Sequence, residues 1–106
     1  MLIHATITIT GDAEQLISCQ ALLRRLLSAH FVKDEITERR RPEALCYDLK
    51  VVGGIPFPAF AQASQQFPRL NFDAEWVNVK VGERCSVTLV DGRATRQSTE
   101  RISKEP

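Results

Sequence analysis

The segment from Ala44 to Val81, ALCYDLKVVGGIPFPAFAQASQQFPRLNFDAEWVNVKV, decides the fold of this chain. Apolar and polar residues alternate over residues 44–52 and again over residues 70–77, which is the period of a half-buried strand. Between these strands, Pro56 and Pro58 suit the first turn of a helix, and Pro68 ends it after roughly ten residues. A strand, a short helix and a second strand predict a helix that covers one face of a sheet.

A longer strand and a longer helix are predicted before this segment. Residues 2–10 alternate between two faces, with Ile3, Ala5, Ile7 and Ile9 on one and His4, Thr6, Thr8 and Thr10 on the other. Asp12 is suited to an N-cap position, and Gln15 completes a capping box. We therefore predict a helix from Ala13 to about His30.

The polar segment from Lys33 to Glu43, KDEITERRRPE, allows two assignments. In the first it is a connection, and Pro42 prevents any helix from continuing into the next strand. In the second, residues 34–40 form an edge strand that turns at Arg41-Pro42 and pairs with the next strand. We prefer the second, because it gives the order β-α-β-β-α-β with both crossovers right-handed on one face.

The C-terminal part of the chain predicts a hairpin. Residues 84–89 alternate, and Asp91-Gly92 is typical of a type I′ turn. A short last strand is therefore predicted over Ala94–Gln97. The polar residues 98–106 are predicted to be a flexible tail, so that residues 1–97 form a single domain.

These elements together predict an α+β fold, a ferredoxin-like β-α-β-β-α-β sandwich. Its sheet is mainly antiparallel, with two helices on one face and a C-terminal hairpin. A chain of 106 residues is long enough for one such core. The fold requires five large apolar side chains to converge in one layer between helices and sheet: Ile3, Tyr47, Phe60, Phe72 and Trp76.

The segment FAQASQQFPRLNFDAEW, followed by VDGRAT, resembles the YubB-type ferredoxin-like domain family of plasmid- and phage-associated proteins. That family likewise has a short helix ending in Ser-x-x-Phe-Pro-x-Leu, a strand with aromatic residues and a late hairpin with Gly at its turn. The chain departs from it at Ile55-Pro56-Phe57, which lacks the family's Trp. The resemblance covers the C-terminal half and implies a fold but no activity. Its residues are Ser64, Phe67, Pro68, Leu70, Phe72, Asp91 and Gly92.

Composition excludes several classes of protein. The chain is 43% hydrophobic and 25% charged, which is typical of a globular domain and argues against global disorder. No apolar run approaches the roughly 20 residues of a membrane helix, and the N-terminus lacks the basic region of a signal peptide. Three widely spaced cysteines, Cys19, Cys46 and Cys85, predict free thiols in a reducing cytoplasm.

Few residues suggest chemistry. On the face opposite the core, His4, Cys46 and Asp48 are the candidates for a catalytic site, because a thiol or carboxylate beside an imidazole can act as a nucleophile or acid–base pair. Asp73 and Glu75 share one strand face and are a second acid–base candidate. No metal site is expected, because His4 and His30 lack a spaced set of further ligands. No phosphate-cradling loop or cofactor motif is present, so no cofactor is expected.

A nucleic-acid partner is disfavoured. The net charge is +1, and the triple arginine at residues 39–41 is interleaved with acidic residues. The face opposite the core also lacks the aromatic residues on which bases stack.

The leading hypothesis is therefore a non-enzymatic binding or protein-interaction domain, with a homodimer through a sheet edge or the open face, a protein partner and no membrane. The alternative is a small enzyme that uses His4, Cys46 and Asp48, and a nucleic-acid-binding module ranks third.

Overall fold

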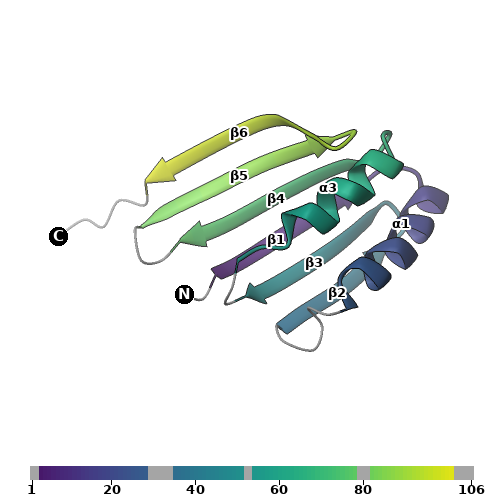
Figure 1. Ribbon diagram of the computed structural model, residues 1–106, viewed down its shortest axis with the longest axis horizontal. Helices are drawn as coiled ribbons and strands as arrows, with labels where there is room; N and C mark the ends of the chain where they lie inside the picture. The colour runs from purple at the N-terminus through teal and green to yellow at the C-terminus, as the bar shows by residue number, and fades with distance from the viewer. Residues whose placement is uncertain (1–2, 29–34, 52–53, 79–81, 102–106) are drawn as a thin grey trace.

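The computed structural model describes residues 3–28, 35–51, 54–78 and 82–101. They form an α+β fold of six strands and two helices (Figure 1). In chain order the elements are β1 (Ile3–Thr10), α1 (Ala13–Leu26), β2 (Glu35–Arg41), β3 (Ala44–Val51), α3 (Phe57–Gln66), β4 (Asn71–Asn78), β5 (Glu83–Val90) and β6 (Arg93–Arg101).

All six strands belong to one antiparallel sheet with the order β2-β3-β1-β4-β5-β6. Both helices cover the same face of the sheet, with α1 in front of β2 and β3 and α3 against β4 and the hairpin end of β5 and β6, most of which extends past the helices (Figure 1). The edge-strand assignment of the polar segment is confirmed, because Glu35–Arg41 pairs with Ala44–Val51. The chain turns between them at Pro42-Glu43, one residue later than predicted.

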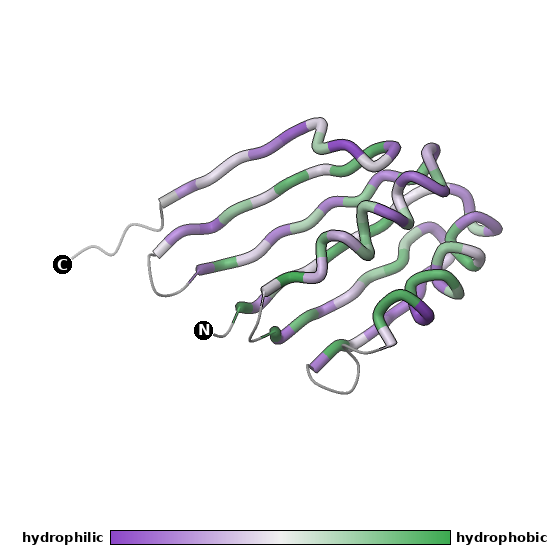
Figure 2. The backbone as a smooth tube through the Cα atoms, viewed as in Figure 1, coloured by the Kyte–Doolittle hydropathy of each residue, from purple (hydrophilic) through white to green (hydrophobic). Residues whose placement is uncertain are grey.

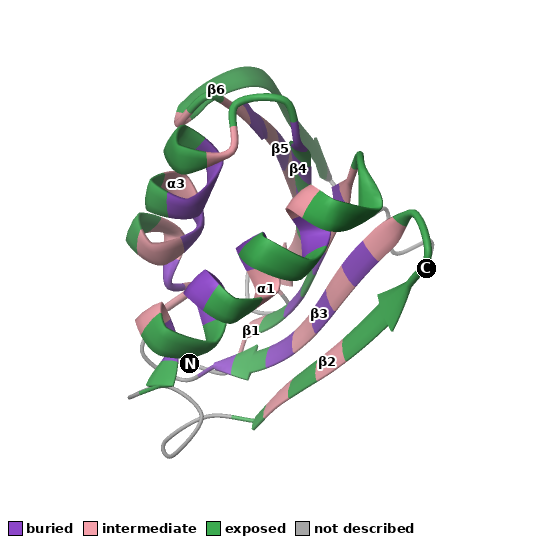
Figure 3. Cartoon of the chain, turned by 90° about the vertical axis from the view of Figure 1, so that its right-hand side faces the viewer, coloured by how far each residue is buried: buried purple, intermediate pink, exposed green. Residues whose placement is uncertain are grey.

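The core lies between the two helices and the sheet, where the buried sides of the helices face the buried rows of the strands (Figure 3). Tyr47, Phe60 and Phe72 are at most 1% exposed, and Ile3 and Trp76 are partly buried against the same cluster. The predicted convergence of these five side chains is confirmed. The hydropathy pattern of the strands follows this division, with apolar and polar residues alternating along β1, β3 and β4 (Figure 2).

Two short aromatic contacts hold α3 on the sheet. The rings of Tyr47 and Phe60 meet edge to face with their centroids 5.8 Å apart, and those of Phe57 and Trp76 do so at 5.3 Å. A helix of ten residues is too short to be stable in isolation, so its stability depends on this burial.

Some predicted boundaries were wrong. The first helix starts at Ala13 as predicted, with the Asp12 side chain accepting a hydrogen bond from the Gln15 N–H, but α1 ends at Leu26. Leu27 is its C-cap, Ser28 is again helical, and the last predicted residues, Ala29 and His30, lie outside the described residues. The last strand is longer than Ala94–Gln97, because β6 continues to Arg101, so Ser98–Arg101 are not part of a tail. Residues 102–106 lie outside the described part of the chain.

The β5–β6 hairpin is fixed to the end of α3. Asp91 and Gly92 both have positive φ, 53° and 74°, as the predicted type I′ turn requires. The Gly92 N–H donates to the Oγ of the fully buried Ser64 at 3.0 Å. A Cβ added to Gly92 would lie 3.2 Å from the Cβ of Gln65, so the turn needs glycine for this close approach as well as for its φ.

We predict that Ser64→Ala lowers the free energy of unfolding by about 1–2 kcal/mol, because it leaves the Gly92 N–H without its acceptor. Urea unfolding measures the loss. Ser18→Ala, on the exposed side of α1, is the matched control and is expected to change stability by less than about 0.5 kcal/mol. Equal effects of the two substitutions would contradict the role of the Ser64–Gly92 bond.

Candidate functional site

The face of the sheet away from the helices is here called the open face. It is polar, and its side chains form hydrogen bonds and ion pairs from one strand to the next. Thr6 donates to Asp48 at 3.1 Å, Arg39 pairs with the other oxygen of Asp48 at 2.6 Å, and Thr88 donates to Asp73 at 2.7 Å. Each of these interactions joins two neighbouring strands. Most of these side chains therefore stabilise the sheet surface instead of converging on one reacting position.

One open concavity of about 610 Å³ lies on this face. Five strands contribute to it, and its lining carries both signs of charge. The residues that give it this character are His4, Glu35, Asp48, Lys50, Glu75 and Arg84. Lys50 and Glu35 form an ion pair across it at 3.6 Å, and both are exposed.

The predicted catalytic residues lie on the open face, but the strand register separates two of them. His4 is opposite Lys50, whereas Cys46 is opposite Thr8, four residues further along β1. At a rise of about 3.3 Å per residue, His4 and Cys46 are about 13 Å apart along the strand. Asp48 is opposite Thr6 and thus lies diagonally from His4 in the same concavity.

The oxygens of Asp48 are occupied by Thr6 and Arg39, so this carboxylate is held as a structural acceptor. Asp73 and Glu75 are both exposed on β4, and Asp73 accepts the Thr88 hydroxyl. In the described ranges no three His, Cys, Asp or Glu side chains come together as metal ligands would. The open face therefore offers separate polar groups and no arranged nucleophile and base.

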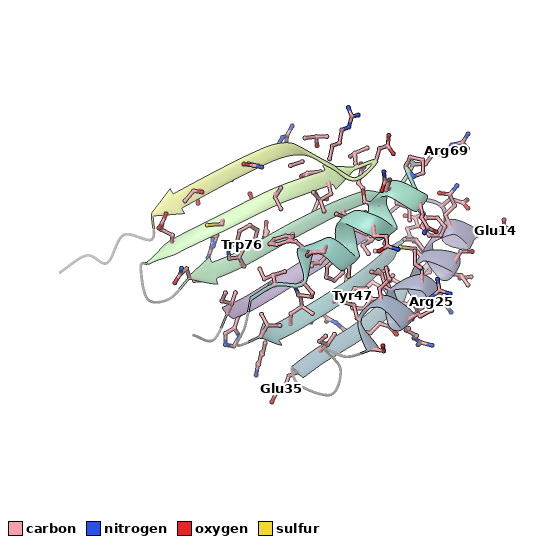
Figure 4. The ribbon with its side chains drawn as sticks, viewed as in Figure 1. Glu14, Arg25, Glu35, Tyr47, Arg69 and Trp76 are labelled. Atoms are coloured by element: carbon pink, nitrogen blue, oxygen red, sulfur yellow. The ribbon has the colours of Figure 1, made fainter. Side chains whose placement is uncertain are left out.

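A second concavity lies on the helix side of the sheet, between α3 and the strands β5 and β6. It has a volume of about 350 Å³, and its apolar lining includes Phe57, Trp76, Val87 and Leu89. Figure 4 shows Trp76 beside the start of α3, at the border of the part of the sheet that the helices leave uncovered. The thiol of Cys85 also lines this groove.

The most strongly perturbed groups lie in a cluster between α1 and the strands β2 and β3. One oxygen of Glu38 accepts hydrogen bonds from Gln20 at 2.7 Å and from both Nε and Nη2 of Arg24, at 3.0 and 2.8 Å. Its other oxygen accepts the Tyr47 hydroxyl at 2.8 Å. The Glu38 side chain is only 13% exposed, and Tyr47 is its register partner on β3.

The pKa values of the cluster follow from this geometry. Burial alone would raise the pKa of Glu38, but the hydrogen bonds from Arg24, Gln20 and Tyr47 outweigh it, so this pKa is lowered. Burial, and then the bond to Glu38, raise the pKa of Tyr47 well above its usual range. Burial also raises the pKa of the Cys19 thiol to about 12, so that thiol is unreactive at neutral pH. Both oxygens of Glu38 are held by hydrogen bonds from neighbouring side chains, so the carboxylate is not free to act as a base, and the cluster is structural.

Glu38 was not among the predicted site residues, although residues 34–40 were assigned to an edge strand. A signal was present: Glu38 follows Ile36 by two positions and therefore shares its helix-facing side of β2. Gln20 and Arg24 are four residues apart, on one side of α1. The sequence does not show that α1 lies over β2. That position brings Gln20 and Arg24 to Glu38.

Comparison with models of known protein families, with curated proteins and with solved structures finds no match for this chain. In the residues that the structure describes, no helix combines the length and the apolar character needed to cross a membrane.

We predict that Tyr47, the only tyrosine, remains protonated until the chain unfolds. Its folded pKa is raised above the unfolded value of about 10, so its contribution to stability is complete below that pH and is lost as the pH rises. Near-ultraviolet absorbance of the phenolate, measured alongside circular dichroism, should show ionisation only with unfolding. Phenolate absorbance in a chain that is still folded just above pH 10 would contradict the shielding of this ring.

A second prediction concerns the carboxylate itself. Glu38→Gln should lower the free energy of unfolding by about 1–3 kcal/mol at neutral pH, because charged hydrogen bonds are lost. The lowered pKa means that this stabilisation is present above the ordinary carboxyl pKa of about 4 and disappears as the pH falls through the folded value. The difference between the two proteins in urea unfolding should therefore shrink in acid.

The control for this substitution is Glu35→Gln on the same strand. Glu35 lies on the open face, 79% exposed, and pairs with Lys50 at 3.6 Å, so its loss should cost less than about 1 kcal/mol. Equal losses for Glu38 and Glu35, or a Glu38→Gln effect that does not depend on pH, would contradict the stabilisation assigned to the ionised Glu38 carboxylate.

Proposed function

We propose that this chain is a non-enzymatic protein-interaction domain that docks a protein partner on the open face of its sheet. The observation that carries the proposal is the character of that face, where polar side chains of both charges from five strands surround one open concavity. Such a surface is suited to hydrogen-bonded, charge-complementary contact with another protein.

The arrangement of the candidate catalytic residues supports binding over catalysis. His4 and Cys46 are about 13 Å apart along the strand, which is too far for the direct proton transfer that activates a thiol. Asp48 shares the concavity with His4, but its oxygens are held by Thr6 and Arg39. The small-enzyme alternative therefore rests on these three residues moving together.

The nucleic-acid alternative has less support. The described part of the open face carries no tyrosine, phenylalanine or tryptophan side chain on which a base would stack. The aromatic residues of the strands point to the helix side of the sheet. Arg39 is paired with Asp48, which reduces the positive field at the β2 edge of the face.

We further propose that the first six elements form a ferredoxin-like unit, to which β5 and β6 are added. The antiparallel order β2-β3-β1-β4 with both helices on one face supports this assignment. The YubB-type resemblance is also kept as a proposal. Its two separate parts meet in the structure, where Ser64 of the helix accepts the N–H of Gly92 in the turn.

A cytoplasmic location is proposed from the cysteines. Cys19, Cys46 and Cys85 are free thiols in three different elements. Two of them lie on opposite faces of the sheet, Cys46 on the open face and Cys85 in the helix-side groove.

We predict that Glu75→Lys weakens the binding of a protein captured from the native cell by about tenfold or more, because it reverses a charge in the concavity. Quantitative affinity capture compares the variant with the unchanged chain. Glu14→Lys is the matched control, since Glu14 is exposed on α1, away from the open face (Figure 4).

Loss of the captured protein from Glu75→Lys but not from Glu14→Lys supports docking on the open face. Equal capture by all three chains contradicts it. A catalytic activity of the purified chain that His4→Ala or Cys46→Ser abolishes would favour the enzyme alternative instead.

A further inference from the structure

The strand β6 is a long, unprotected edge. It is the last strand of the sheet and pairs only with β5 in the described part of the chain. Its residues 93–100 are all exposed, and it contains neither proline nor glycine. Such a strand presents a row of unpaired backbone N–H and C=O groups, which can template pairing with another strand.

The register of β6 on β5 shows which of its side chains share a face. Arg96, Ser98 and Glu100 are opposite Thr88, Ser86 and Arg84, so they project from the open face. Ser98 and Ser86 are hydrogen-bonded at 2.7 Å. The only irregularity of the pairing lies before Arg96, between Thr88 and Leu89 on β5, so the rest of β6 is regular.

We propose that β6 pairs antiparallel with β6 of a second copy of this chain, with Ser98 on the twofold axis. In this register Arg96 of each copy is directly opposite Glu100 of the other, so the strand is complementary to itself in charge. Glu100 then lies between two arginines, Arg84 of its own chain and Arg96 of the partner copy.

Other registers that keep both helix layers on one side lack this match. An axis through Gln97 sets Arg96 opposite Ser98 and Glu100 opposite Ala94, so no opposite charges face each other. An axis through Arg96 sets that residue opposite its own copy, and like charges that face each other across strands repel. The charge pattern therefore selects the axis at Ser98.

The other edge of the sheet is less suited to self-pairing. On β2, Glu35 and Arg39 already form ion pairs with Lys50 and Asp48. On β6, neither Arg96 nor Glu100 takes part in an ion pair within the described residues. Glu38, held by α1, also ties β2 to the helix layer.

The expected dimer is of moderate strength. Pairing through a single edge buries less than the roughly 1,200 Å² of a stable interface, so we expect a dissociation constant on the order of micromolar. The pairing lies in the plane of the sheet and therefore leaves the open face accessible. This inference does not depend on the partner proposed for that face.

The test uses two charge reversals, Arg96→Glu and Glu100→Arg, in the full chain. Each places two like-charge pairs in the proposed register, and each should weaken self-association by about tenfold or more. Mixed in equal amounts, the two variants restore both attractive pairs and should form a heterodimer of about the original affinity. Sedimentation equilibrium measures all three samples, and circular dichroism verifies that each variant is folded.

Two further variants complete the design. The double variant with both reversals should dimerise like the unchanged chain. Arg93→Glu, the same change of charge outside the paired segment, should leave the dimer intact. A monomeric unchanged chain at high micromolar concentration, or a mixture that does not recover association, would overturn the proposal. Neither result would test docking at the open face, because that proposal is tested separately by affinity capture with Glu75→Lys.

Discussion

The central strands β1, β3 and β4 each have to bury one row of side chains beneath α1 and α3. Because side chains alternate, that constraint also decides which row is left on the open face. In β1 it buries Ala5, Ile7 and Ile9, and it exposes His4 and Thr6. A slip of one residue would reverse both faces. The surface available for function is therefore a direct consequence of how the core is packed.

Apolar burial alone does not fix every element equally well. The edge strand β2 directs few apolar side chains to the core, and Ile36 is only partly buried. Glu38 supplies what is missing, because its carboxylate joins Tyr47 of β3 to Gln20 and Arg24 of α1. A buried carboxylate that loses its partners is costly, so alternative registers of β2 are disfavoured. Ser64 has a similar role near the opposite edge of the sheet, because its hydroxyl accepts the Gly92 N–H and so fixes the hairpin to α3.

The sequence predicts the elements whose side chains face a core. The alternation of Leu45, Tyr47, Leu49 and Val51 located β3, and Asp91-Gly92 located the hairpin, because both signals are local. The length of β6 could not be read in the same way, since its exposed residues need no apolar alternation and its pairing depends on β5. The separation of His4 from Cys46 is likewise set by the register of two distant strands. The positions of the candidate site residues depend on contacts between segments far apart in the sequence, and local patterns do not reveal these contacts.

Two helices cannot cover six strands, and we propose that association takes place at the uncovered part of the sheet. The hairpin adds area beyond α3, which leaves a groove beside Trp76 on one face and a free edge at β6 (Figure 1). Pairing at that edge adds strands in the plane of the sheet, so two copies would present two open faces on the same side. A partner with two matching sites would then bind the pair with higher avidity than a single face provides. In the proposed dimer the hairpin would therefore link self-association to docking, because the edge of β6 and the open face are different surfaces.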